Sequence, residues 1–266
     1  MKKQLFLLSL SINLISASEL DIGIGVGVME YPDYLGSENS NTLAIPYPFF
    51  WYRSENLNID GNGLKKRLFS INNLSLRLSM SGSLPVKSSG ARDGMADLDP
   101  AGEIGPALVY TFYDKDGLDI KFDLPIRAVV SSDFQSTIDY RGYLSDPKIA
   151  VDYDFGEKYL FQFQTGGVWA DSRYHNYLYG VDDSFVTDSR KEYSTKAGYS
   201  GYKTSMGISK VYEKAWIGAF VRHYTLSGSV FGDSPLKRKN SAIYAGLFVA
   251  YLFDKDISNK VKSWID

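Results

Sequence analysis

Eleven consecutive residues, from Leu118 to Ala128, alternate between apolar and polar side chains without a break. The apolar face carries Leu118, Ile120, Phe122, Leu124, Ile126 and Ala128, and the other face carries Asp119, Lys121, Asp123, Pro125 and Arg127. Period two is the period of a β-strand. At about 3.3 Å per residue the run is roughly 36 Å long, and a tilt near 45° projects it onto about 25 Å, the height of the apolar band of a transmembrane barrel. The run therefore predicts a wall strand with one face toward lipid and one toward a water-filled lumen.

Other segments repeat this pattern. Leu74–Ser81 and Leu20–Val28 both alternate, the second with glycines opposite its apolar residues, and Lys148–Phe155 opposes apolar residues to Lys148, Asp152 and Asp154. We interpret these segments as strands with apolar residues toward lipid and polar residues toward the lumen. In the final strand, near 241–253, Tyr244 and Phe248 share the second face, which leaves its orientation open.

Twelve strands account for the chain. We place them near 19–28, 43–53, 56–61, 63–70, 73–82, 103–113, 118–130, 147–155, 158–170, 200–211, 215–227 and 241–253. The short links then fall on one rim, and the long links (29–42, 83–102, 131–146, 171–199 and 228–240) fall on the other, together with the tight turn at 61–63. Bacterial barrels sort their links in this way, with short periplasmic turns and long outer loops. We predict an all-β fold, a single antiparallel transmembrane β-barrel of about 12 strands, with 10 to 14 as the range.

Four prolines lie inside these strands: Pro46, Pro48, Pro106 and Pro125. Each removes a ladder donor, and a closed barrel has no free edge to accommodate the loss. We expect bulges or strand ends at these positions.

Both ends of the chain differ from the barrel. Lys2 and Lys3 precede an apolar stretch and then small residues at 16–18, which is typical of a cleaved signal peptide over 1–18. A membrane-anchoring helix is the alternative, but the apolar stretch is about eleven residues long and a spanning helix needs about 20. The mature barrel then covers 19–253, followed by a polar tail at 254–266 whose purpose the pattern does not reveal. We predict export to the outer membrane, with lipid as one partner.

The amino-acid composition narrows the classes of protein to which this chain could belong. Removing Lys2 and Lys3 leaves 27 basic against 31 acidic residues, so nothing suggests binding to nucleic acid. The absence of cysteine excludes disulfides and thiol chemistry. The chain has 20 Tyr, 15 Phe and 4 Trp, which suits the aromatic girdles of a barrel, with a tyrosine-rich soluble β-protein as the alternative.

Few residues are candidates for catalysis or for binding a metal ion. The two histidines are His175, in a predicted outer loop beside Asp171 and Ser172, and His223 on a strand, and neither stands in a spacing typical of a catalytic motif. Asp93, Asp97, Asp99 and Glu103 supply oxygens of the kind that Ca²⁺ prefers, but they lack the spacing of a calcium loop. We interpret them as a solvated loop, and we predict no catalytic residue, metal or cofactor. The glycines at 23, 25 and 27 alternate inside a strand and are better explained by a narrow lumen than by a dinucleotide site.

Five segments in order resemble the MipA/OmpV family of outer-membrane proteins: PDYLGS at 32–37, PYPFFWYR at 46–53, DLDPAGEIGPALVY at 97–110, DSRYHNYLYGV at 171–181 and HYTLSGSVFGDSPL at 223–236. The resemblance implies an outer-membrane barrel without enzymatic activity. One branch of the family is described as a scaffold that links a lytic murein transglycosylase to a penicillin-binding protein, and other members are discussed as porin-like, adhesive or envelope-stress proteins.

Three functions follow from these observations. The first is a scaffold whose periplasmic turns and tail contact a murein transglycosylase and a penicillin-binding protein. The second is a narrow porin-like channel, and the third is a hydrolase at the rim that depends on His175 or His223. The candidate lumen residues are Arg77, Asp119, Lys121, Asp123, Arg127 and Asp152. The candidate loop residues from the family segments are Pro32, Tyr34, Gly36, Ser37, Tyr174, Tyr177, Gly180, Ser234 and Pro235.

Overall fold

The computed structural model describes residues 19–54, 56–60, 63–133, 135, 138–156, 158–253, 255 and 258. The proposed signal peptide at 1–18 lies outside these residues, as does all of the tail at 254–266 except Lys255 and Ser258. None of the helices in this part of the chain is long and apolar enough to cross a membrane.

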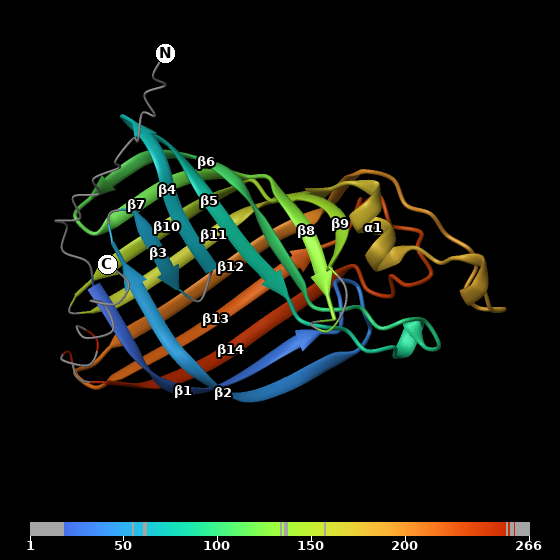
Figure 1. Ribbon diagram of the computed structural model, residues 1–266, viewed down its shortest axis with the longest axis horizontal. Coiled ribbons are helices and arrows are strands. Elements are labelled where there is room, and N and C mark those ends of the chain that lie inside the picture. The colour runs from blue at the N-terminus through green and yellow to red at the C-terminus, as the bar shows by residue number, and fades with distance from the viewer. Residues whose placement is uncertain are drawn as a thin grey trace, which may run out of the picture.

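Fourteen antiparallel strand segments form one closed sheet in the described residues. They are β1 (Glu19–Pro32), β2 (Ser40–Arg53), β3 (Leu57–Asp60), β4 (Gly63–Ile71), β5 (Leu74–Ser83), β6 (Ala101–Lys115), β7 (Leu118–Pro125), β8 (Arg127–Ser132), β9 (Ile138–Ser145), β10 (Lys148–Phe155), β11 (Tyr159–Ala170), β12 (Gly198–Val211), β13 (Ala215–Thr225) and β14 (Ser241–Leu252). The first and last strands pair, with Gly23 opposite Leu252, and β10 pairs with both β7 and β11. The all-β barrel that the sequence predicts is confirmed (Figure 1).

Two of the fourteen segments continue the strand before them. β7 and β8 both pair with β6, and β9 and β10 both pair with β11, so each pair runs on as one bent strand. The ring therefore has twelve positions, in agreement with the predicted count. The segment 131–146, which we expected to be an outer loop, instead contains the end of β8 and all of β9 (Ile138–Ser145). Asp139 and Arg141 gave this segment a loop-like polarity, but they form an ion pair with each other within the strand.

The alternating run that predicts the barrel is split at Ile126, between β7 and β8. The break lies beside Pro106 on β6, whose carbonyl accepts the Ile126 N–H at 2.9 Å. The expected strand end at Pro125 is confirmed. The bulges expected at Pro46 and Pro48 are wrong, because β2 stays in continuous register with β1 through both residues.

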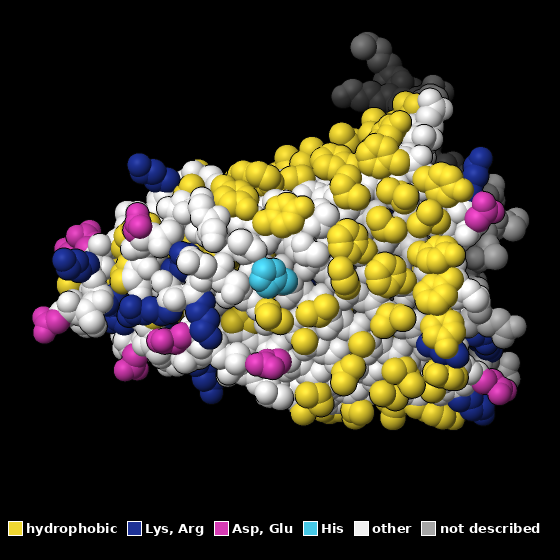
Figure 2. Space-filling model, turned by 180° about the vertical axis from the view of Figure 1, so that it is seen from behind, with side chains coloured by type: hydrophobic (Ala, Val, Ile, Leu, Met, Phe, Trp, Pro, Cys, Tyr) yellow, Lys and Arg dark blue, Asp and Glu magenta, His cyan; other side chains and the backbone are white. Residues whose placement is uncertain are grey.

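The outer surface of the barrel is apolar. Ile24, Val26 and Leu247 are 62 %, 65 % and 68 % exposed on the strands' outward faces. Figure 2 shows hydrophobic side chains spread over the barrel wall, while charged side chains gather toward the two ends. Exposed aromatic residues lie near both ends of the strands, among them Phe112, Tyr153 and Tyr251 at one end and Tyr143, Trp169 and Tyr202 at the other.

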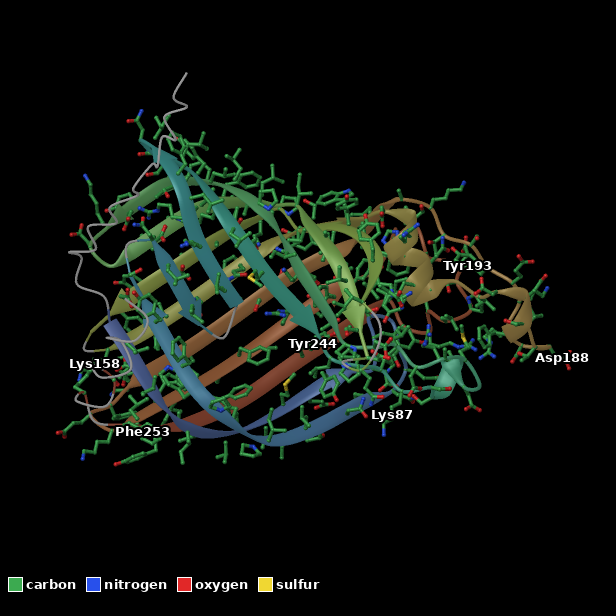
Figure 3. All side chains as sticks on the ribbon, viewed as in Figure 1. Lys87, Lys158, Asp188, Tyr193, Tyr244 and Phe253 are labelled. Atoms are coloured by element: carbon green, nitrogen blue, oxygen red, sulfur yellow. The ribbon has the colours of Figure 1, made fainter. Side chains whose placement is uncertain are left out.

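The two rims differ as predicted. Short turns join strands at one end, where Lys158 and Phe253 lie, and long links occupy the opposite end, where Tyr193 and Asp188 lie (Figure 3). One long link forms helix α1 (Ser172–Tyr179), which the sequence analysis treated as loop. Asp171 begins this helix, and its carboxylate accepts the Tyr174 N–H at 2.9 Å. In bacterial barrels the short turns face the periplasm.

Candidate functional site

The barrel encloses a cavity of about 780 Å³, which is within the range of small-molecule sites. Its lining comes from strands of the ring other than β3 and β4 and from the long links at the outer end. The two halves of this lining differ in chemistry. One half, from β5 to β12, carries ionised side chains, and the other, from β13 through β14 and β1 to β2, is mainly aromatic.

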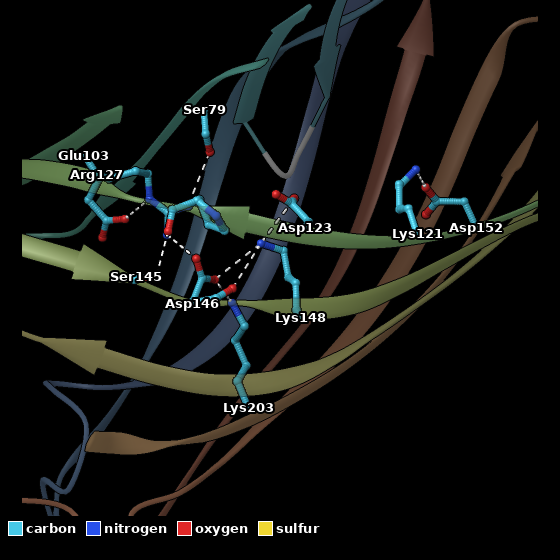
Figure 4. A network of polar contacts seen from close by, with 11 residues as sticks. Ser79, Glu103, Lys121, Asp123, Arg127, Ser145, Asp146, Lys148, Asp152 and Lys203 are labelled. Atoms are coloured by element: carbon cyan, nitrogen blue, oxygen red, sulfur yellow. Dashed lines mark hydrogen bonds and ion pairs between the residues drawn. The ribbon is translucent and has the colours of Figure 1, made fainter. Parts of the chain in front are cut away.

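The charged wall is a connected set of ion pairs centred on Asp146 (Figure 4). Asp146 joins β9 to β10 and accepts from Arg127 Nη2 at 2.6 Å; it also pairs with Lys148 at 3.6 Å and with Lys203. Arg127 Nε donates to Glu103 Oε2 at 2.9 Å. The side chains of Arg127 and Asp146 are both less than 8 % exposed, so these charges satisfy one another with little help from water. Buried charges of this kind are tolerated only when paired and hydrogen-bonded.

A second group of pairs lies toward the short turns. Lys121 pairs with Asp119 and, at 2.8 Å, with Asp152, while Lys148 reaches Asp123 at 3.4 Å. Five of the six candidate lumen residues thus have opposite charges as partners, and all but Asp119 line the cavity. The sequence analysis did not assign Glu103, Asp146, Lys148 or Lys203 to this network. The alternation of Lys148 with Ala150 and Asp152 was the available signal for Lys148, whereas Asp146 fell in the presumed loop.

Two cations of the lining differ from the rest. Arg77 Nε donates to Ser75 Oγ at 3.2 Å, and Arg222 lies 6.0 Å from the centre of the Phe220 ring. Among the described residues neither guanidinium has a carboxylate within ion-pair distance, although both line the cavity. Within the described residues the lumen therefore carries two arginines that no carboxylate contacts directly, although Asp119, Asp123 and Asp152 act on Arg77 electrostatically from farther away.

The aromatic wall is a packed layer of rings. Phe49 lies 5.2 Å from Trp216, Phe248 lies 5.7 Å from Tyr47, and Tyr224 lies 5.8 Å from Tyr244, measured between ring centres. The β1 glycines make room for this layer, because a Cβ at Gly25 would collide with the Tyr47 ring and one at Gly27 with the Phe248 ring. This agrees with the narrow lumen inferred from the glycine series.

Polar atoms in the aromatic wall lack partners. Tyr47 Oη, Trp216 Nε1 and Arg222 Nε are buried, and none has a hydrogen-bond partner among the described residues. A buried donor without an acceptor costs roughly 1–3 kcal/mol. Three such donors on one wall of a cavity are available to a polar group of a bound molecule.

The long links fold into a cap over the outer end of the cavity. Its core contains Tyr34, Tyr179, Leu226, Phe231 and Leu236, all at most 5 % exposed, with the rings of Tyr179 and Phe231 stacked at 3.7 Å. Two buried arginines join the links through main-chain carbonyls: Arg92 donates to Leu178 and Ala96, and Arg190 donates to Phe185, Ala91 and Asp93. The cap is therefore an ordered part of the fold.

The candidate loop residues from the family segments lie in this cap. Tyr34 Oη donates to Leu236 O at 2.7 Å, and Ser234 Oγ donates to Tyr179 O at 2.8 Å. Tyr177 Oη donates to Asp99 O at 3.1 Å, and Gly36 has the positive φ of +89° that glycine adopts readily. Pro32 ends β1, Ser37 Oγ accepts from Asn39 N, Tyr174 lines the cavity, Gly180 ends α1 and Pro235 follows Ser234.

The histidines occupy different environments. His175 is 1 % exposed, and its ring nitrogens contact Lys196 O at 2.8 Å and Ser200 Oγ at 2.7 Å. Burial lowers the pKa of His175, so the ring is neutral, with Nδ1–H donating to Lys196 and Nε2 accepting from Ser200. The Asp171 carboxylate, which would orient such a histidine in a triad, instead caps α1. His223 is exposed and points outward from β13, away from the lumen.

The acidic segment near β6 is dispersed. Glu103 pairs with Arg127 in the lumen, and Asp97 Oδ1 accepts the Ser88 N–H at 2.6 Å. In the part of the chain that the structure describes, no three acidic or histidine side chains converge in a way that could hold a metal ion.

Comparison with known proteins agrees with this architecture. The family model described as MltA-interacting protein MipA matches residues 24–253. The chain is 28 % identical to outer membrane protein Omp26La of Vibrio anguillarum and 29 % identical to outer membrane protein OmpV of Vibrio cholerae. Each comparison covers 86 % of this chain and 85 % of the relative.

The similarity to solved structures is weaker. A NanC porin matches with a TM-score of 0.40 and 9 % identity, over 86 % of this chain and 98 % of that one. OmpT of Vibrio cholerae matches with a TM-score of 0.37 and 9 % identity, over 89 % of this chain and 98 % of that one.

Proposed function

This chain belongs to the MltA-interacting protein MipA family of outer-membrane proteins, and from this premise we propose that it binds one small amphipathic solute in a capped lumen instead of serving as an open pore. The observation that carries the proposal is the division of the cavity into an aromatic wall and a charged wall. An apolar ring or chain packs against the aromatic wall, and an anionic end meets the arginines of the lining, Arg77 on the charged wall and Arg222 on β13.

The unpaired groups favour an anionic end. Among the described residues, Arg77 and Arg222 line the cavity without a carboxylate in contact, and Trp216 Nε1 and Tyr47 Oη are buried donors of the same lining without a hydrogen-bond partner. Carboxylates and phosphates are the groups that arginine binds best, through charge-assisted hydrogen bonds. The cap covers the outer end of the same cavity, which supports a binding site in preference to a freely open diffusion pore.

Binding of dansyl-undecanoic acid, a fluorescent single-chain carboxylate, tests the proposal in the barrel refolded into detergent micelles. We expect saturable binding that Arg222→Met weakens at least about tenfold, because a hydrogen bond to a charged group contributes about 1.5–3 kcal/mol. The outward His223→Gln on the same strand is the matched control and leaves affinity unchanged. Equal affinity in both variants, or a large steady conductance of the unmodified protein in planar bilayers, contradicts the proposal.

A second candidate function is the scaffold, and the family's description as MltA-interacting carries it. The partners would be a murein transglycosylase and a penicillin-binding protein on the periplasmic side. Because the turns there are short and a stable interface buries roughly 800 Å² per partner, several turns or the tail must act together. Lys255 at the start of the tail pairs with Asp21 at the short-turn end of β1.

Pull-down of the murein transglycosylase tests the scaffold. Deleting 254–266 and reversing the charges of Asp114, Lys115 and Asp116 in the β6–β7 turn should abolish capture. The same reversal at Asp188 and Lys191 in the cap serves as the control. Undiminished capture by the first variant would exclude a periplasmic scaffold.

A further inference from the structure

The ring of Phe248 lies flat against the barrel wall. A Cβ at Gly27 would collide with Cδ1 and Cε1 of this ring, and a Cβ at Gly246 would lie 2.7 Å from its Cε2. Gly27 is the partner of Phe248 on β1, whereas Gly246 lies two residues from Phe248 on β14. Because opposite edges of one ring reach the Cβ positions of glycines on two neighbouring strands, the plane of the ring runs along the wall.

Phe220 extends this flat surface. Its ring makes an angle of 19° with the Phe248 ring, and the two ring centres are 6.1 Å apart. Its Cε1 is also 2.7 Å from the Cβ position of Gly246, which is the partner of Phe220 across β13 and β14. The two rings therefore lie side by side and nearly in one plane over the same glycine. We call Phe220 and Phe248 the ring platform.

One face of the ring platform is open to the lumen. Phe220 and Phe248 are half-buried and line the cavity, whereas Gly27 and Gly246 beneath them are buried and do not line it. Aromatic rings pair in offset-stacked or edge-to-face arrangements, and such a pair raises affinity roughly two- to tenfold beyond the effect of the apolar area it buries. The platform therefore offers its open face to a planar ring.

A cation stands at the edge of the platform. Arg222 follows Phe220 by two residues on β13, so both side chains point into the lumen, and its Cζ is 6.0 Å from the centre of the Phe220 ring. The Tyr224 hydroxyl is hydrogen-bonded to Arg222, but Arg222 Nε is buried without a hydrogen-bond partner among the described residues. A carboxylate attached directly to a ring on the platform would lie within reach of this guanidinium, which binds carboxylates through paired N–H donors.

The flat arrangement favours a ring over an alkyl chain as the apolar part of the ligand. An alkyl chain gains from the burial of apolar area whatever the tilt of the surrounding rings, because the hydrophobic effect has no direction. Stacking instead requires a flat, accessible face. Glycine inside a strand weakens the strand, yet Gly27, Gly218 and Gly246 each lie beneath an aromatic ring, that of Trp216 in the case of Gly218. These glycines hold the rings against the wall.

From these observations we propose that the ligand of the lumen is an aromatic carboxylate, whose planar ring stacks on Phe220 and Phe248 and whose acid group is bound by Arg222. This inference rests on the proposed lumen binding, and it adds the chemical class of the ligand and its position on the wall.

Titration calorimetry of the barrel in detergent micelles tests this class with two acids of similar size and equal charge. 2-Naphthoate is planar and aromatic, and decahydro-2-naphthoate is its saturated, puckered counterpart. We expect 2-naphthoate to bind roughly two- to tenfold more tightly, because only its ring can stack. Titration of each acid into empty micelles corrects for partitioning. Glucuronate, an acidic sugar, should bind more weakly than 2-naphthoate, and tighter binding of glucuronate would overturn the aromatic class.

Two substitutions in the platform separate stacking from burial. Gly246→Ala places a methyl group against both rings and should tilt them, and Phe248→Leu keeps an apolar side chain without a flat face. Each should weaken 2-naphthoate roughly two- to tenfold and should change the affinity for decahydro-2-naphthoate less than about twofold. Gly102→Ala and Phe112→Leu, at exposed positions of β6, are the matched controls and should change neither affinity.

The outcomes distinguish the ligand class from the binding itself. Equal affinities of the unmodified barrel for the two naphthalene acids, or an equal loss of both in Phe248→Leu, overturns the stacking and leaves lumen binding intact. Absence of binding by every carboxylate, dansyl-undecanoic acid included, overturns both proposals. If Gly246→Ala does not fold, Phe248→Leu decides alone.

Discussion

The two walls of the lumen are built from the same alternating strands but are stabilised by opposite means. On the charged wall, Arg127, Asp146 and Lys203 depend on one another, because each buried charge requires a partner. On the aromatic wall, Tyr47 and Phe248 depend on space, which the glycines of β1 provide. The charged wall should therefore respond most to the loss of a charge, and the aromatic wall most to the addition of volume.

The largest effect is expected at the centre of the charged wall. Asp146→Ala leaves Arg127, Lys148 and Lys203 together without their shared carboxylate, which should lower the free energy of unfolding by about 3–5 kcal/mol. Urea unfolding in detergent micelles, followed by tryptophan fluorescence, measures the loss. Asp139→Ala, which removes the more exposed partner of Arg141, is the control and should cost at most about 1 kcal/mol. Similar losses for both variants would show that the network around Asp146 is not coupled.

A smaller effect is expected from filling the aromatic wall. Gly25→Val would drive a side chain into the Tyr47 ring and the main chain of β14, which should cost about 1–3 kcal/mol. The same unfolding measurement applies. Gly102→Ala on β6 meets only a Val130 methyl at 4.0 Å and should be close to neutral. A neutral Gly25→Val would mean that the ring layer is loosely packed.

The smallest effect is expected in the cap, where a titratable ring is buried among apolar ones. The His175 ring centre lies 5.3 Å from that of Phe231, and burial lowers the pKa of His175, while the hydrogen bond to Lys196 O and, less strongly, Asp171 oppose the shift. Unfolded His175, with an ordinary pKa near 6.5, binds protons before the folded form does, so its contribution to stability is present above about pH 6.5 and is lost as the pH falls below it. Proteolysis of the cap links at pH 7.5 and pH 5.5 should show this weakening. His175→Gln should remove the difference in proteolysis rate between the two pH values. A difference that persists in this variant would show that another titratable group causes it.

The sequence was informative where a local rule applied. Alternation placed Lys121, Asp123 and Arg127 on a polar face and Ile24 and Val26 on an apolar one, and the structure shows these faces toward the lumen and the exterior. Link lengths gave the two rims and a count of twelve strand positions. Asp146 was missed because Asp139, Arg141 and Pro147 make its surroundings resemble a loop.

The aromatic residues show a second limit. Composition suggested girdles at the membrane surfaces, yet Tyr47, Trp216 and Phe248 pack inside the barrel and Tyr34, Tyr179 and Phe231 form the core of the cap. A pattern of period two distinguishes the two faces of a strand but does not say which aromatic face turns inward when both faces carry rings, as on β14.

The amino-acid sequence by itself determined the strands, their two faces and the closed membrane barrel, because these follow from the two-residue period of the chain and from the need to pair main-chain groups in lipid. Only the tertiary structure decided that charged and aromatic faces oppose each other across one lumen and that four distant links fold into a cap. These features depend on which strands become neighbours when the ring closes, and ring closure is a property of the whole chain.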